Sequence, residues 1–301
     1  MRVAFTSDLH GDVTSRNREL LPFLAEEVAR LRPDVFVIAG DAANDLRALG
    51  TVLSHFDGVA AQKLFVPGNH DLWLESKKAL RRREDSWHKY RVAVPEVCSA
   101  HGFHALCGSP MEIDGVGFVG SVGWYDFSLA DPRLAEVYRA EDYEHGEFAT
   151  ELGPTWWNDL SRAAWLRNPD AEDWRQRRAT LTSREVFARV LALLEEDLAA
   201  VRSDVNALVA VLHTAPFAEC LERKEPADPF DAYEGSAALG RLLARRAKLR
   251  LTWCICGHRH RPLDLLVEGV RVVRCPVGYL DGAVEDLGQV AGRSIGVIEL
   301  P

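Results

Sequence analysis

Five short polar motifs, each built from His, Asp or Asn, constrain the fold of this chain more than any other feature. Three of them closely follow apolar runs, rich in β-branched or aromatic residues, at residues 3–5, 35–38 and 208–212. Such runs are typical of buried parallel strands, and open α/β sheets place their ligands at the carboxyl ends of those strands. We therefore expect the motifs to converge on one pocket. In chain order they are Asp8-Leu9-His10, Gly40-Asp41, Gly68-Asn69-His70-Asp71, His213 and Gly257-His258-Arg259-His260.

The first third of the chain alternates strand-like and helix-like segments. Strands are predicted at residues 3–6, 35–39 and 63–66. Helices are predicted at residues 18–31 and 46–56, the first from apolar side chains that recur every three or four positions. This βαβαβ order is typical of a parallel sheet, because each helix carries the chain back to start the next strand.

The later part of the chain predicts hairpins and a mixed sheet. Two amphipathic helices, at residues 183–202 and 235–248, each lead into a strand-like run. Turn residues such as Glu268-Gly269 separate several short strand-like segments, which indicates antiparallel pairing. Together with the first third, this pattern predicts an α/β fold. The expected strands are at residues 103–106, 115–119, 208–212, 251–256, 263–267, 270–274 and 294–299.

A polar, aromatic-rich stretch at about residues 124–180 fits neither pattern. It holds five of the eight tryptophans, so we predict one domain over residues 1–301 with this stretch inserted as a cap over the pocket. Its aromatic side chains either stack on a substrate ring or anchor the insertion to the domain. Both interpretations stay open at this point for Trp124, Tyr125, Trp156 and Trp157.

The composition is that of a soluble globular protein with a sizeable core. The chain has 301 residues, 47% of them hydrophobic, and a net charge of -9, which disfavours unaided binding to nucleic acid or to an anionic membrane. No apolar stretch approaches the roughly 20 residues that span a bilayer. The first apolar run leads into Asp8 rather than into a cleavage site, so we expect no signal peptide and a cytoplasmic location. The six cysteines are too dilute for a disulfide scaffold and are expected to be buried thiols.

The motif side chains offer carboxylate oxygens, imidazole nitrogens and one amide oxygen, with no thiolate. This mixture suits divalent Mn, Fe, Ni, Co or Zn. Two such ions about 4 Å apart repel each other and need a shared anionic ligand, for which Asp41 is the candidate. With Asp8, Asp41 and a hydroxide counted, such a centre keeps a charge of about +1 and attracts a phosphate despite the acidic chain.

All five motifs, in this order, resemble the D-x-H, G-D, G-N-H-D/E, H and G-H-x-H blocks of the calcineurin-like metallophosphoesterases. The blocks run from Asp8 to His260, so the resemblance covers nearly the whole chain. Each block alone occurs often by chance, whereas five in order are specific. The resemblance implies a four-layer αββα sandwich with two mixed central sheets and a metal site at the C-terminal ends of strands.

The resemblance also implies a role for each motif residue. A metal-bridging hydroxide would attack phosphorus, and His70 would donate a proton to the leaving oxygen. Two divalent ions are implied, with Mn favoured over Fe, Zn, Ni or Co. One metal would be held by Asp8, His10, Asp41 and His260, and the other by Asp41, Asn69, His213 and His258.

One position departs from the protein-phosphatase branch of that family. That branch carries an aspartate three residues after the shared one, which orients the catalytic histidine; here the position is Asn44. Asp45 or Asp71 would then be the carboxylate partner of His70, although Asp71 equally suits the cap of a helix. The phosphodiesterase-like branch is therefore the better match.

The leading hypothesis is a dinuclear-metal-dependent hydrolase of phosphomonoesters or phosphodiesters, acting on a small molecule or nucleotide. The alternative is a metal-dependent nuclease, which the absence of an evident basic stripe disfavours. A non-catalytic scaffold ranks last, because every ligand and His70 are present. The sequence predicts a phosphorylated small-molecule substrate and no association with a membrane, and it does not indicate an oligomeric state.

The run Arg81-Arg82-Arg83 fits an exposed helical face better than a phosphate contact. Structural roles are expected for His55, His88, His101, His104 and His145.

Overall fold

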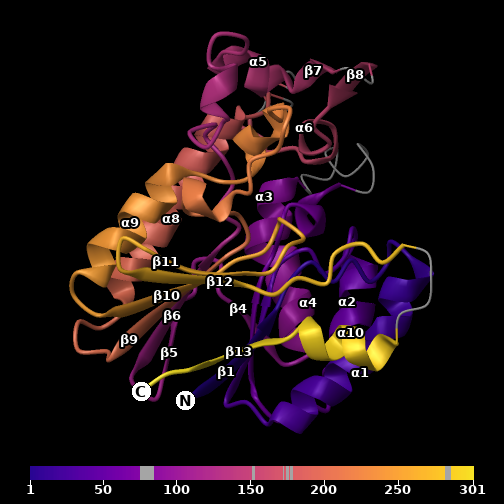
Figure 1. Cartoon of the computed structure of the whole chain (residues 1–301), viewed down its shortest axis with the longest axis vertical. Coiled ribbons are helices and arrows are strands. Elements are labelled where there is room, and N and C mark those ends of the chain that lie inside the picture. Colours follow the sequence, from indigo (N-terminus) through magenta and orange to yellow (C-terminus); the bar gives the residue numbers. More distant parts are fainter. Residues whose placement is uncertain (75–84, 151–152, 172, 174–175, 177–178, 282–285) are drawn as a thin grey trace.

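Two mixed β-sheets lie face to face and carry helices on their outer sides, which gives four layers in the order αββα (Figure 1). The computed structural model describes residues 1–74, 85–150, 153–171, 173, 176, 179–281 and 286–301. The run Arg81-Arg82-Arg83 lies outside the described residues. The predicted α/β sandwich with two central sheets is confirmed.

The first sheet has five strands in the order β13-β1-β2-β3-β4. Strands β1 to β4 are parallel, and β13 pairs antiparallel with β1 at the edge. Its strands are β1 (Arg2–Thr6), β2 (Val35–Ala39), β3 (Gln62–Val66), β4 (Phe103–Ala105) and β13 (Gly296–Glu299). The helices associated with it are α1 (Ser15–Leu31), α2 (Leu46–Ser54), α4 (Val94–Ala100) and α10 (Leu287–Arg293). The predicted βαβαβ order is therefore confirmed.

Helix α1 shows how local chemistry sets these elements. It begins three residues before its predicted start, because the Thr14 side chain caps it by accepting a hydrogen bond from the Asn17 backbone. Its buried face includes Leu20, Leu24 and Val28, whose spacing puts all three on one side of the helix. The apolar stripe that predicted the helix is thus the face that packs into the core.

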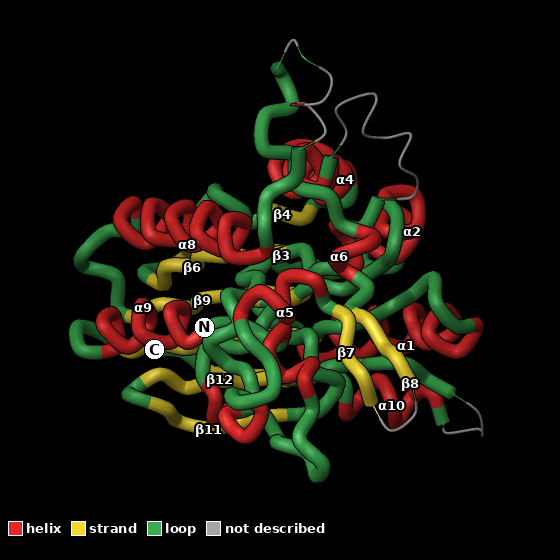
Figure 2. Tube along the Cα trace, turned by 90° about the horizontal axis from the view of Figure 1, so that it is seen from above, coloured by secondary structure: helices red, strands yellow, loops and turns green. Residues whose placement is uncertain are grey.

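The second sheet has six strands in the order β11-β12-β10-β9-β6-β5. The inner pairs are parallel and the two edge pairs are antiparallel. Glu268 and Gly269, both with positive φ, form the tight turn between β11 and β12, as predicted. The strands are β5 (Met111–Ile113), β6 (Val116–Ser121), β9 (Ala207–Leu212), β10 (Leu251–Ile255), β11 (Leu263–Val267) and β12 (Val270–Arg274). Helices α8 (Ser183–Ala200) and α9 (Ala237–Ala247) lie along this sheet (Figures 1 and 2).

The space between the sheets is filled by branched and aromatic side chains. Val37 from β2, Val211 from β9 and Ile255 from β10 are fully buried in one apolar cluster. The opposite faces of the same strands pack against the helices, so strands such as β2 and β9 are buried on both sides. This is why they read as unbroken apolar runs in the sequence.

The insertion forms a small layer of its own at one end of the molecule (Figure 1). It contains α5 (Ala140–His145), α6 (Asp159–Arg162) and a separate two-stranded sheet of β7 (Glu147–Thr150) and β8 (Gly153–Trp156). Trp124 and Tyr125 are buried in the main core, where they anchor the insertion as the second interpretation expected. Trp156 is 61% exposed.

Five of the six cysteines are buried thiols, as predicted. In the part of the chain that the structure describes, no helix combines the length and the apolar character needed to cross a membrane.

Short helical turns complete the chain. They are η1 (His70–Leu72), α3 (Ser86–His88), η3 (Lys89–Ala93), η4 (Pro132–Leu134), η5 (Ala218–Cys220) and η6 (Pro229–Tyr233).

Candidate metal centre

Each of the five sequence motifs follows the end of a strand, and the two sheets both contribute. Strands β1, β2 and β3 of the first sheet lead into the motifs that begin at Asp8, Gly40 and Gly68. Strands β9 and β10 of the second sheet lead into His213 and Gly257. Because the motif side chains contact one another across the sheets, as described below, the site lies at the carboxyl edge of both sheets.

The turns after these strands need unusual backbone conformations. Asp8, His10, Asp41 and His258 all adopt positive φ, between 45° and 69°. Such conformations are costly for residues other than glycine and persist where surrounding contacts hold them. Here the Asp8 backbone amide donates to the Gly40 carbonyl at 2.9 Å, and that of His10 donates to the Asp41 carbonyl at 3.0 Å. The turns from β1 and β2 therefore brace each other.

Gly68 allows the turn after β3 to approach the turn after β2 closely. A Cβ atom at this position would lie 2.6 Å from the Asp41 backbone nitrogen and 2.7 Å from Cε1 of His213. Neither neighbour is the free end of a flexible chain, so a side chain at residue 68 would displace the site. The glycine before Asn69 is thus a requirement of packing at the site.

One group of side chains joins the first motif to the last. Asp8, His10 and His260 bring one ligand atom each to within 4.8 Å of one another. The Nε2 atoms of His10 and His260 face each other at 3.0 Å, and Nε2 of His260 lies 3.6 Å from Oδ1 of Asp8. Two imidazole nitrogens and a carboxylate thus converge on one point.

A second group joins the middle motifs. Nε2 of His213 lies 3.4 Å from Oδ2 of Asp41, and His258 completes the set within 4.8 Å. The amide oxygen of Asn69 lies 3.1 Å from Nε2 of His213 and 3.0 Å from Nδ1 of His258. Oδ2 of Asp41 is also 3.9 Å from Nε2 of His10. Asp41 therefore stands between the two groups, in the position expected of a shared ligand.

The protonation chemistry of these side chains fits divalent cations. Burial lowers the pKa of His10 to about 3 and holds the pKa of His258 well below its usual range, so both rings are neutral and keep a lone pair. Nδ1 of His213 donates to the Ala39 carbonyl oxygen at 2.9 Å, which directs Nε2 toward Asp41. Burial opposes the charged ring, but the Asp41 carboxylate outweighs it and raises the pKa of His213 to about 10, so a cation at Nε2 would replace a proton. Nitrogen lone pairs and carboxylate oxygens that face one another are what a bound cation requires.

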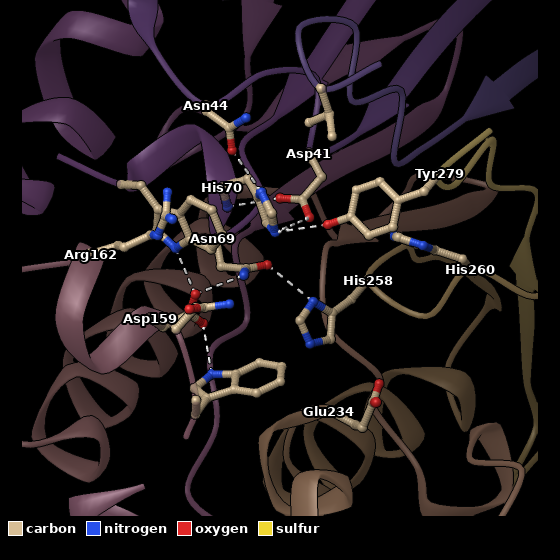
Figure 3. Close-up of a pocket in the computed structure, with 14 residues that line it drawn as sticks. Asp41, Asn44, Asn69, His70, Asp159, Arg162, Glu234, His258, His260 and Tyr279 are labelled. Atoms are coloured by element: carbon tan, nitrogen blue, oxygen red, sulfur yellow. Dashed lines mark hydrogen bonds and ion pairs between the residues drawn. The ribbon is translucent and has the colours of Figure 1, made fainter. Parts of the chain in front are cut away.

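His70 lies beside these groups, with one ring nitrogen within 4.8 Å of ligand atoms of His10 and Asp41, and it is held through its other nitrogen. Its Nδ1 donates to the side-chain oxygen of Asn44 at 2.8 Å, which leaves Nε2 facing the pocket, 3.9 Å from Oδ2 of Asp41 (Figure 3). The Asn44 amide nitrogen in turn donates to Asp12 at 3.0 Å. The imidazole of His70 also stacks on the indole of Trp73, with ring centroids 3.6 Å apart.

The two carboxylates that the sequence offered as partners of His70 have other roles. Asp45 caps α2 by accepting from the Ala48 backbone amide at 2.8 Å. Asp71 is buried and accepts from the backbone amides of Ala43 at 3.0 Å and Gly68 at 2.8 Å, which joins the turns after β2 and β3. The expectation of a carboxylate partner is therefore wrong, because Asn44 alone of these residues reaches the ring.

These groups line a pocket of about 470 Å³. Its volume is within the range of small-molecule sites. The insertion contributes one wall of it, and Tyr279, from the segment after β12, contributes another with its hydroxyl 3.5 Å from Nε2 of His70. The lining residues are Val13, Asp41, Asn44, Asn69, His70, Trp73, Trp157, Asn158, Asp159, Arg162, Glu234, His258, His260 and Tyr279.

A family model described as calcineurin-like phosphoesterase matches residues 1–262. The chain belongs to the calcineurin-like phosphoesterase family. This calcineurin-like phosphoesterase is accordingly a hydrolase that acts on phosphoester bonds. The match spans all five motifs and ends before Tyr279.

One of two similar solved structures shares the fold of this calcineurin-like phosphoesterase. Phosphopantetheinyl hydrolase from Mycobacterium tuberculosis aligns with a TM-score of 0.67 and 19% identity, over 92% of this chain and 89% of that chain. A dimetal phosphatase from Danio rerio aligns with a TM-score of 0.47 and 15% identity, over 91% and 86% of the two chains. A search of curated proteins found no match.

The insertion of this phosphoesterase reaches the metal centre through Asp159, at the start of α6. This carboxylate is 1% exposed and accepts from the Asn69 amide nitrogen at 2.9 Å and from the Trp73 indole at 2.7 Å. Trp157 donates to it at 3.0 Å and Tyr125 at 3.3 Å. No motif marks Asp159 in the sequence, because its partners lie up to 90 residues away in the chain.

Proposed function

We propose that this phosphoesterase uses two divalent cations to hydrolyse a phosphomonoester or phosphodiester of a small molecule or nucleotide. The observation that carries the proposal is the pair of His and Asp groups, joined through Asp41, at the wall of a 470 Å³ pocket. A pocket of this size accommodates a small phosphorylated molecule. The acidic chain, with a net charge of -9, favours such a substrate over a nucleic acid strand.

In this proposal the cations are held by the same residues that the sequence indicated. Asp8, His10, Asp41 and His260 would hold one ion, and Asp41, Asn69, His213 and His258 the other. When bound, two divalent ions supply the positive charge that lowers the pKa of a water molecule and stabilises negative charge on phosphoryl oxygens. Mn is the favoured metal, and Fe, Zn, Ni and Co share its preference for these donors.

His70 is proposed as the proton donor to the leaving oxygen. Asn44 accepts from Nδ1, so the proton that moves is the one on Nε2, which faces the pocket. After the transfer the ring is neutral, and its remaining proton, on Nδ1, stays hydrogen-bonded to the side-chain oxygen of Asn44. The stack on Trp73 fixes the plane of the ring, and so the direction in which the proton is delivered.

The test is hydrolysis by the Mn-loaded protein of 4-nitrophenyl phosphate, bis(4-nitrophenyl) phosphate and single-stranded DNA. We expect release of 4-nitrophenol from at least one of the two small esters and its loss when the metals are removed by a chelator. Cleavage of DNA alone would favour a nuclease and contradict the small-molecule proposal. No hydrolysis of any of the three, with two metals bound per chain, would support a non-catalytic scaffold.

A further inference from the structure

Arg162 brings the only arginine side chain to the pocket wall among the described residues. It ends helix α6 of the insertion, and its guanidinium carbon lies 4.7 Å from the centroid of the Trp73 ring. The same indole lies against the imidazole of His70, with ring centroids 3.6 Å apart. The guanidinium and the proposed proton donor therefore contact the same aromatic ring.

The charge of Arg162 is not neutralised within the described part of the chain. No carboxylate of the described residues forms an ion pair with it, and its side chain is exposed to the pocket. The acid on the same helix, Asp159, already accepts four hydrogen bonds from other residues. By contrast, Arg259, between His258 and His260 in the chain, pairs with Asp231 at 3.3 Å and with Glu234 at 3.6 Å.

We propose that Arg162 and Trp73 form a subsite for a second oxyanion, a carboxylate or a phosphate, carried by the leaving group of the substrate. This inference rests on the proposed function. His70, Trp73 and Arg162 line the same pocket, so a leaving group whose oxygen is protonated by His70 can extend to the guanidinium. A guanidinium presents paired N–H donors that match the two oxygens of such a group, and stacking on an indole holds its plane.

The test compares substrates that differ by one anionic group. Glycerol 3-phosphate and 3-phosphoglycerate differ only in a hydroxymethyl group replaced by a carboxylate; propyl phosphate and propane-1,3-diol bisphosphate make the corresponding phosphate pair. With the Mn-loaded protein we expect kcat/KM to favour the member that carries the second anionic group in at least one pair by about tenfold, the worth of one exposed charged hydrogen bond. The pair that shows the preference identifies the oxyanion.

Variants assign that preference to the guanidinium. Arg162→Ala and Arg162→Gln should both lower the ratio of the two kcat/KM values to about one, because the charge of the guanidinium, rather than its planar shape, binds the oxyanion. Arg162→Lys keeps the charge and should retain part of the preference. Arg189→Ala is the matched control, since it removes an exposed arginine of α8 that does not line the pocket, and it should leave the ratio unchanged. An unchanged melting temperature would show that the Arg162 variants are folded.

Two results would overturn the inference while the proposed function stands. One is equal kcat/KM within both substrate pairs for the wild-type protein, together with hydrolysis of 4-nitrophenyl phosphate. The other is a preference that persists in both Arg162→Ala and Arg162→Gln. Failure to hydrolyse 4-nitrophenyl phosphate, bis(4-nitrophenyl) phosphate and all four alkyl esters would overturn the proposed function and this inference with it.

Discussion

The side-chain amide of Asn69 points its nitrogen at Asp159, 2.9 Å away, and its oxygen at His213 and His258. An amide has one donor end and one acceptor end, so the carboxylate decides which end faces the metal groups. Asp159 is therefore a positioning residue for a proposed metal ligand. Asp159 belongs to the insertion, so it connects the least regular part of the chain to the candidate metal centre.

Replacement of Asp159 by Ala should weaken Mn²⁺ binding. Without the carboxylate the Asn69 amide is free to rotate and present its NH₂ group to the cation, and loss of such an outer partner typically costs about 10- to 100-fold in affinity. Calorimetric titration of the metal-free protein with Mn²⁺ measures the change. Ser161→Ala, on the same helix, is the control, because within the described part of the chain its hydroxyl donates to the Asn158 carbonyl alone. A variant that keeps wild-type affinity while its melting temperature falls would mean that Asp159 only anchors the insertion.

Replacement of His70 by Ala should leave two metals bound and slow turnover, most strongly for poor leaving groups that need a proton. Elemental analysis and rates on aryl phosphates of increasing leaving-group pKa measure the two effects. Asn44→Ala should give a weaker form of the same behaviour, because the ring stays but loses the acceptor for Nδ1. Loss of metal from His70→Ala would contradict its assignment as a proton donor.

Replacement of Asp41 by Asn should lower the occupancy of both metal positions together. The side chain lies 3.4 Å from His213 of one group and 3.9 Å from His10 of the other, and a neutral amide cannot balance two cations. Metal content per chain after dialysis tests this. Asp8→Asn is the matched comparison, since Asp8 joins only the first group, and should chiefly affect one metal. Two metals at full occupancy in Asp41→Asn would refute the shared position.

The free energy of unfolding should fall as pH rises from about 4 to about 6, in part because of Asp197. This carboxylate of α8 accepts from the Gly108 backbone amide at 3.1 Å, and Arg91 and Glu196 are the charged groups around it. Burial raises its pKa to about 6 from an ordinary 3.8. Between these values the folded state holds a proton that the unfolded chain has released, so up to about 2 kcal/mol is lost as pH rises through this window.

Urea unfolding at several pH values tests the role of Asp197. Asp197→Asn should flatten the dependence between pH 4 and pH 6, because the amide does not ionise and its oxygen still accepts from Gly108. Glu195→Gln, at an exposed position of the same helix, should leave the dependence as in the wild-type protein. An unaltered slope in Asp197→Asn would show that other groups cause it.

Particular elements show which features local sequence encodes. The apolar runs at β2 and β9 predicted strands, because a strand that is buried on both faces has apolar residues at successive positions. The apolar stripe of α1 predicted a helix, because a helix that is buried on one face has apolar residues at every third or fourth position. The insertion gave no such signal, and its strands β7 and β8 were not predicted. Strand β5 and helix α4 are short, and their apolar residues are too few to define a period.

The motifs alone did not predict which residue forms the hydrogen bond to His70. The spacing placed Asn44 in the right position, yet the charged neighbours Asp45 and Asp71 looked like better partners because a carboxylate binds an imidazole more strongly. In the folded chain both are occupied by backbone amides of the turns they stabilise. A linear motif does not report such competing hydrogen bonds.

The order of residues alone predicts the α/β architecture, the family and a set of candidate metal-binding side chains, because strand periodicity and motif order are local properties. Folding decides how those side chains are supported and what surrounds them. Asp159, Arg162 and Tyr279 join the pocket by contacts between segments distant in the chain. Since such contacts depend on how the insertion and the C-terminal segment pack against both sheets, they leave no pattern in the sequence.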